Sequence, residues 1–241
     1  MIFDPFNDFE VRGYLRNVFS EKDLSIIKHA EHSAFMASLA DAFNLLSSIQ
    51  LLAYRDVLHT HKILFGDVYP WAGQDRAQTA PDIAVSRGNV LFSHPQDAKA
   101  AVEYALKLSL DKAVMSNKSG EVMGYLAYGH PFLDGNGRTI MVIHAELAQR
   151  AGISIDWSKT DKAAYLTALT QEIEKPGAGA LDAYLKPYLR SAVGSEHLAE
   201  HAINTRGLEG YSTEDNTILG KVTDPELQAR YEQQKIQRQR T

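Results

Sequence analysis

Residues 130–138, HPFLDGNGR, bring together side chains that phosphate chemistry needs. His130 offers an imidazole that can take a proton from a hydroxyl near neutral pH. Asp134 offers a carboxylate for a hard cation such as Mg²⁺, which typically binds one or two carboxylates together with phosphate and water. In the turn Gly135-Asn136-Gly137, two of three residues lack a Cβ, so the backbone can turn tightly and approach a ligand. The segment therefore predicts a base, a metal ligand and an anion seat.

The residues after this turn predict a buried helix. Ile140, Ile143 and Leu147 recur at helical spacing, and Gly152 follows the last apolar turn. The anion seat then lies at a helix N-terminus, where unpaired N–H groups and the macrodipole favour phosphate. Arg138 in the first turn opposes that dipole unless an anionic ligand is present. The alternative is that His130 and Asp134 only cap the helix.

The segment resembles the signature of the Fic (Fido) family, HxFx(D/E)GNGRxxR, at every position except the last. Residues 63–73, ILFGDVYPWAG, are similar to the family segment that leads into a β-hairpin called the flap. The resemblance implies an all-α, Fic-type helical bundle with a small β-hairpin flap. It also implies a protein adenylyltransferase, which moves AMP from Mg-ATP to a Tyr, Thr or Ser hydroxyl of a target protein.

The resemblance also assigns roles residue by residue. His130 is the general base, Phe132 a structural anchor and Asp134 the Mg²⁺ ligand. The turn Gly135-Asn136-Gly137 binds phosphate, and Arg138 clamps it.

Position 141 departs from the family signature. The second family arginine, which the resemblance implies holds the distal phosphates, is Met141 in this chain. A thioether carries no charge and cannot pair with phosphate. Three interpretations follow: weakened ATP transfer, a different donor, or a substitution introduced to alter activity.

The chain outside the motif is expected to be mainly helical and to divide into three parts. These are an N-terminal helical extension (residues 1–44), a Fic domain (45–192) and a polar C-terminal tail that is partly helical (193–241). Helices are expected over residues 20–43, from residue 47 or 48 to 65, and over 96–108, the last introduced by a capping box at Ser93-His-Pro-Gln96. Two more amphipathic stretches cover residues 165–173 and 181–192.

A hairpin is expected over residues 83–92, with Gly88 at its turn. Its position matches the flap of the family. An exposed strand edge at Ile83, Val85, Gly88 and Val90 could pair with an extended target segment and bring its hydroxyl to His130. The alternative is that the hairpin only covers the core.

Composition argues against several other classes of function. Lys plus Arg number 25 and Asp plus Glu 30, a net charge of −5, which does not favour nucleic-acid binding. The chain has no cysteine for a disulfide or a Cys-ligated zinc site. No membrane partner is expected, because no apolar stretch approaches membrane length and the N-terminus lacks a signal-peptide pattern. We expect a cytoplasmic protein, with delivery as a secreted effector as the alternative.

The tail contains a weak match to the inhibitory pattern of the family, (S/T)xxxE(G/N), at Thr205 to Gly210 with Glu209 as its glutamate. A solvated tail is the favoured interpretation, because Gly207 disfavours a helix there. Inhibition by a separate partner protein is another expectation from the resemblance. Two alternatives to adenylyl transfer stay open: a Fic relative that transfers UMP or phosphocholine, and a nucleotide-binding module with weakened catalysis.

Overall fold

Two long helices at the centre of the molecule carry the motif between them. The computed structural model describes residues 2–205 and 216–239. Helix α6 (Lys112–Gly129) ends where the motif begins, and α7 (Asn136–Ala151) starts inside it. Residues 130–135, here called the motif loop, connect them. Helix α7 ends at Gly152 with φ of 87°, as the sequence predicts.

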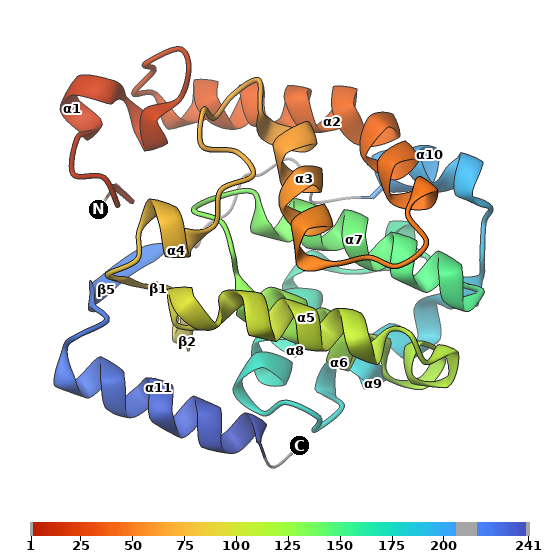
Figure 1. The fold of residues 1–241 in the computed structure, drawn as a ribbon. Coiled ribbons are helices and arrows are strands. Elements are labelled where there is room, and N and C mark those ends of the chain that lie inside the picture. Colours follow the sequence, from red (N-terminus) through yellow and green to blue (C-terminus); the bar gives the residue numbers. More distant parts are fainter. Residues whose placement is uncertain (1, 206–215, 240–241) are drawn as a thin grey trace.

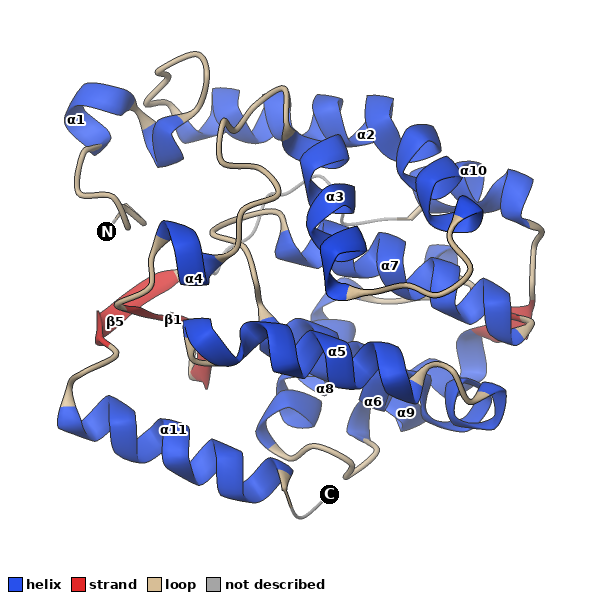
Figure 2. Ribbon diagram, in the orientation of Figure 1, coloured by secondary structure: helices blue, strands red, loops and turns tan. Residues whose placement is uncertain are grey.

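The rest of the molecule is mainly helical, as expected (Figure 2). The other α-helices are α1 (Phe9–Arg12), α2 (Leu24–Ser48), α3 (Tyr54–Phe65), α4 (Arg76–Thr79), α5 (Ala98–Leu108), α8 (Lys162–Glu174), α9 (Ala180–Leu185), α10 (Leu198–Ile203) and α11 (Pro225–Arg238). Short 3₁₀ turns are η1 (Tyr14–Arg16), η2 (Pro95–Asp97), η3 (Trp157–Lys159), η4 (Lys186–Tyr188) and η5 (Ser195–His197).

Helix α2 differs from its expected bounds and removes one expected domain boundary. The Asp23 carboxylate accepts from the Ser25 N–H at 2.8 Å and starts the helix. The helix does not stop near residue 43, because Ala42, Phe43 and Leu46 continue its buried face. It packs against α3 and α7 (Figure 1). A division after residue 44 would therefore cut through one helix.

The strands form two small sheets. Strands β1 (Ile83–Arg87) and β2 (Val90–Leu91) make the expected hairpin, and β5 (Thr217–Lys221) pairs antiparallel with the other edge of β1. A second sheet pairs β3 (Ile153–Ile155) with β4 (Leu189–Ser191). β3, β4 and β5 were not predicted, and the helix expected over residues 181–192 ends at α9 and η4 instead.

The C-terminal segment packs onto the flap sheet (Figure 1). A small apolar cluster joins β1 and β2 to α11 and to the residue after β5, and consists of Ala84, Leu91, Val222, Leu227 and Tyr231. The Gln234 amide donates to the Leu91 carbonyl at 2.9 Å. Part of the expected polar tail thus covers the outer side of the flap. Among the described helices, none has the length and apolar character needed to cross a bilayer.

Candidate active site

The motif loop holds its shape through the Asn136 side chain. The Asn136 Oδ1 accepts from the Phe132 N–H at 2.9 Å, and Nδ2 donates to the Phe132 carbonyl at 2.7 Å. Asn136 was expected in the phosphate-binding turn. Its side chain instead faces the loop interior, so only its backbone remains for an anion. The expected anchor, Phe132, is buried and stacks on His61 at 3.7 Å.

His130 is a buried, neutral imidazole. Its ring stacks on Phe92 at 3.6 Å between centroids, and the Asn136 amide lies 3.1 Å from Nε2. Because an amide nitrogen only donates, Nε2 holds a lone pair and the proton is on Nδ1. Burial, reinforced by the positive charges of Arg76 and Arg87, lowers the pKa of His130 well below its ordinary value. The ring is therefore neutral at neutral pH, which is the form that a general base requires.

The two motif glycines serve different purposes. Gly135 has φ of 75°, and an added Cβ would lie 2.6 Å from the Phe65 ring, so this position needs glycine for packing. Gly137 is exposed, and an added Cβ would meet nothing within 4 Å. The N–H groups of the first turn of α7 have no partner inside the helix. The open side of Gly137 therefore leaves them accessible to an anion.

Arg138 already holds a carboxylate. Its Nη2 donates to Glu31 of α2 at 2.5 Å, and the guanidinium lies over the Phe65 ring at 4.6 Å. Glu31 is fully buried and also accepts from Tyr69 and from Lys28. The Nη1 of Arg138 is buried and has no hydrogen-bond partner among the described residues. Nη2 is thus paired with Glu31, whereas Nη1 is a donor that no described residue uses.

Asp134 lies in a strongly cationic environment. Its carboxylate is ion-paired with Lys28 and accepts from the Tyr14 hydroxyl at 3.2 Å. Burial alone would raise its pKa, but the charges of Lys28 and Arg138 and the Gly135 N–H hold the pKa of Asp134 well below its ordinary value. The Lys28 ammonium also contacts Glu31 at 3.0 Å, so a cation already lies between two carboxylates. Carboxylate oxygens such as these suit a hard cation such as Mg²⁺, which completes its coordination shell with phosphate and water.

His61 of α3 supports the same loop. Its Nδ1 accepts from the Gly73 N–H at 3.0 Å, so Nε2 carries the proton and donates to the Asp134 carbonyl at 3.0 Å. Burial lowers the pKa of His61 to about 3, so the ring stays neutral. The sequence gives no sign of this role, because His61 lies far from the motif along the chain.

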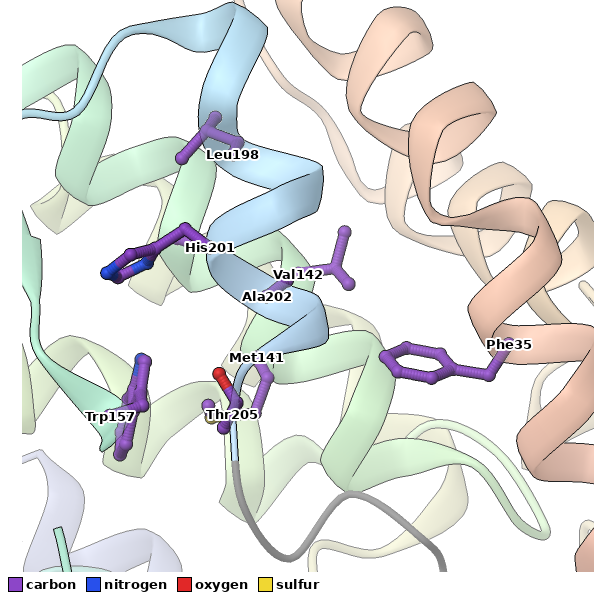
Figure 3. Close-up of a pocket in the computed structure, with 9 residues that line it drawn as sticks. Phe35, Met141, Val142, Trp157, Leu198, His201, Ala202 and Thr205 are labelled. Atoms are coloured by element: carbon purple, nitrogen blue, oxygen red, sulfur yellow. The ribbon is translucent and has the colours of Figure 1, made fainter. Parts of the chain in front are cut away.

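Met141 lies in an apolar environment (Figure 3). It lines a cavity of about 20 Å³ with Phe35 of α2, Trp157, His201 of α10 and Thr205, which follows that helix. A cavity of this size holds no more than about one water molecule. A methionine fits this setting better than a cation does.

The flap residues lie close to the motif but do not all face outward. The side chains of Val85 and Val90 are buried, Ile83 is half-buried, and Gly88 forms the hairpin turn with φ of 54°. The two valine side chains are therefore part of the core, and the expected docking at these positions concerns the strand edge. Only the strand backbone could pair there, and β5 covers one edge of β1. Glu209, the expected inhibitory residue, lies outside the described residues.

The structure adds partners that the sequence did not indicate. Glu31, Lys28 and Tyr14 come from segments more than a hundred positions before the motif residues they contact. No local spacing links such distant residues. A buried acid on an otherwise apolar helical face was the one available signal, at Glu31.

Comparison with known proteins agrees with this geometry. Residues 51–148 match the family model described as Fic/DOC family. The chain is 30% identical over 215 residues to "Protein adenylyltransferase VbhT" of Bartonella schoenbuchensis, an alignment that covers 84% of this chain and 41% of VbhT. It is 30% identical over 126 residues to "Probable protein adenylyltransferase y4lH" of Sinorhizobium fredii, covering 48% of this chain and 62% of that protein. The aligned part of the chain thus spans less than two thirds of the length of each of these two relatives.

Solved structures share the fold. A Bartonella tribocorum BepC protein with bound AMPPNP superimposes with a TM-score of 0.58 at 19% identity, covering 73% of this chain and 91% of that one. The Fic domain of a Bartonella quintana effector protein with bound ADP gives a TM-score of 0.60 at 21% identity, covering 74% and 92%. Residues 51–148 of this chain therefore form a Fic/DOC family domain.

Proposed function

We propose that the protein is a protein adenylyltransferase that moves AMP from ATP to a Tyr, Thr or Ser hydroxyl of a target protein. One arrangement carries the proposal. The motif loop and the start of α7 hold a buried, neutral His130 next to a helix N-terminus that is exposed at Gly137. Arg138 in the same helix turn has a donor, Nη1, that no described residue uses. The names of the similar proteins VbhT and y4lH, and the AMPPNP and ADP bound by similar structures, point to the same chemistry.

The reaction follows from these positions. The phosphates of ATP bind at the first turn of α7 and against Arg138. The hydroxyl oxygen of the target forms a bond to the α-phosphorus while the bond from that phosphorus to the β-phosphate oxygen breaks, and pyrophosphate leaves. Nε2 of His130 takes the hydroxyl proton after the Asn136 amide releases the Nε2 lone pair. A neutral imidazole is required, which agrees with its lowered pKa.

Asp134 is the residue that we propose holds Mg²⁺ together with phosphate oxygens. When bound, the metal neutralises charge on the phosphates of the donor and on the leaving group. Lys28 would have to give up its contact with Asp134, or share that carboxylate. Within the described residues no group of three or more His, Cys, Asp or Glu side chains forms a separate metal cage, so the phosphates must supply ligands.

The target is proposed to dock as an extended segment at the flap sheet. The β1 edge is already paired with β5, and Asn216 just before β5 donates to the Leu133 carbonyl in the motif loop at 3.0 Å. A target strand must therefore pair at another edge or displace β5. Regulation by a partner protein or by Glu209 remains a proposal from the family resemblance.

The donor is tested by labelling proteins of a cell lysate with ATP that carries the label either on the α- or on the γ-phosphate, in the presence of Mg²⁺. Adenylyl transfer predicts label only from the α-phosphate. Label from the γ-phosphate would indicate a kinase and contradict the proposal. Parallel reactions with labelled UTP and CDP-choline test UMP and phosphocholine transfer. Tight ATP binding without transfer from any donor would favour the weakened nucleotide-binding module that Met141 suggests.

A further inference from the structure

Four consecutive carbonyl groups, from the end of α6 into the motif loop, share two donor residues. Ser93 donates from its N–H to the Tyr128 carbonyl at 2.9 Å and from Oγ to the Gly129 carbonyl at 2.9 Å. Arg76 donates from Nε to the His130 carbonyl and from its N–H to the Pro131 carbonyl, both at 2.7 Å. The last carbonyls of a helix have no partner inside it. Here the partners come from outside the helix, and the carbonyls that they support include that of His130, the proposed base.

The backbone of His130 needs this support. It has φ of 39° and ψ of 57°, a left-handed conformation that residues other than glycine adopt rarely. Such a conformation persists where surrounding contacts impose it. Both donors are fully buried, and the Nη2 of Arg76 also donates to the Ser93 carbonyl at 2.9 Å, which joins the two donors to each other.

The two donors flank the flap. Arg76 begins α4, which leads into β1, and Ser93 directly follows Phe92, whose ring stacks on His130. Ser93 had been expected to cap the next helix. In the structure His94 caps the 3₁₀ turn η2 before that helix by accepting from the Gln96 N–H, and the Ser93 hydroxyl donates to the Gly129 carbonyl instead.

We propose that Arg76 and Ser93 are positioning residues for the proposed base, His130: from the two ends of the flap they fix the left-handed turn that places its imidazole against Phe92 and Asn136. The proposal rests on the proposed function, since it assumes that His130 takes the proton. It adds that the flap sets the geometry of the base. Small displacements of a reacting group reduce the rate strongly while leaving donor binding intact.

Electrostatics gives Arg76 a second effect. Burial is the main cause of the lowered pKa of His130, and the charges that face the ring are Arg76 from α4 and Arg87 from β1. Loss of the Arg76 charge should therefore raise the pH at which activity falls on the acid side. Replacement by lysine keeps the charge but loses the guanidinium geometry.

The test compares Ser93→Ala with Ser109→Ala in steady-state transfer of α-labelled AMP. Ser109 is a matched control, because it is also buried and its Oγ donates to the Leu106 carbonyl at the end of another helix, at 2.6 Å. Each variant loses one buried hydrogen bond, so we expect each Tm to fall by about 2–4 °C. We expect Ser93→Ala alone to lower kcat about tenfold, with KM for ATP unchanged.

Equal kcat values for Ser93→Ala and wild type, or equal losses in the two serine variants, would overturn the proposal, and so would a change confined to KM for ATP. A second comparison uses Arg76→Lys and Arg76→Met, with kcat followed over pH. We expect both to lower the plateau and only Arg76→Met to move the acid limb upward. If Arg76→Met does not fold, the serine pair still decides. Retained transfer in His130→Ala would instead disprove the proposed base, a result that these variants cannot imitate.

Discussion

Glu31 and Arg138 form a buried ion pair beside the proposed phosphate seat. Glu31 is fully buried, and its carboxylate takes a 2.5 Å hydrogen bond from the guanidinium expected to hold phosphate. We predict that Glu31→Gln, which keeps the shape and removes the charge, tightens ATP binding. The amide oxygen remains a neutral acceptor, so Arg138 is freed from a charged partner without losing all support.

The size of the effect follows from the difference between two kinds of hydrogen bond. Bonds to charged groups contribute about 1.5–3 kcal/mol and neutral ones about 0.5–1.5 kcal/mol. The difference of about 1–2 kcal/mol corresponds to roughly 5- to 30-fold tighter binding. Removal of a negative charge close to the phosphates acts in the same direction. Stability should fall, because Lys28 and Arg138 lose a shared buried counter-charge.

Calorimetric titration with ATP in excess Mg²⁺ measures the affinity, and Glu146→Gln is the matched control. Glu146 is a buried carboxylate further along α7, paired with Arg150 at 2.8 Å. Both variants should have a lower Tm, and only Glu31→Gln should bind ATP more tightly. If folded Glu31→Gln binds ATP no better than wild type, the Glu31 charge does not compete with phosphate for Arg138, and the reasoning is refuted.

Three further predictions concern the metal, position 141 and acid stability. Asp134→Ala should raise the Mg²⁺ concentration needed for half-maximal ATP binding by at least about tenfold, because a protein carboxylate ligand is lost. Identical Mg²⁺ titrations of variant and wild type would show that Asp134 does not bind the metal. Met141→Arg should raise the ATP-to-AMP affinity ratio about tenfold if the guanidinium reaches a distal phosphate. It should also lower Tm, because position 141 lines an apolar pocket in which a charge is costly. An unchanged affinity ratio would mean that position 141 faces only that pocket. Burial holds the pKa of His61 at about 3, that of His144 at about 4 and that of His130 well below 6.5, so as pH falls below 6.5 the unfolded chain binds protons that the native chain does not. Over the two pH units below 6.5, His61 and His144 each lose roughly 3 kcal/mol, and their sum reaches the lower end of the stability of a domain. His130 acts in the same direction. Far-UV circular dichroism should therefore show acid unfolding at about pH 4.5, and a native spectrum at pH 3.5 would contradict this.

The local part of the site could be predicted from the sequence, because the chemistry lies within one short segment. The turn, the start of α7 and its end at Gly152 all follow from residue types and helical spacing. The partners of the site could not be predicted, since Glu31 meets Arg138 across 107 positions and Lys28 meets Asp134 across 106. Only the packing of α2 against α7 brings them together.

The strands likewise divide into those that the sequence predicts and those that it does not. The hairpin was predicted because β-forming residues flank Gly88. Strand β5 was missed because its partner is β1, far away in the sequence, and its own five residues include a glycine and a lysine. The boundary expected after residue 44 failed for another reason: the apolar face of α2 continues through Leu46 into the core that the motif helix shares.

The most direct test of the proposed mechanism separates donor binding from transfer in His130→Ala. The imidazole contacts Asn136 and Phe92 and is placed to accept a proton, whereas the anion seat belongs to α7 and Arg138. We predict that the variant binds Mg-ATP within a few-fold of wild type and that the single-turnover transfer of α-labelled AMP to lysate proteins falls by about 10²–10⁴. Transfer at a near wild-type rate would show that His130 is not the base, and loss of ATP binding together with transfer would show that it serves the seat instead.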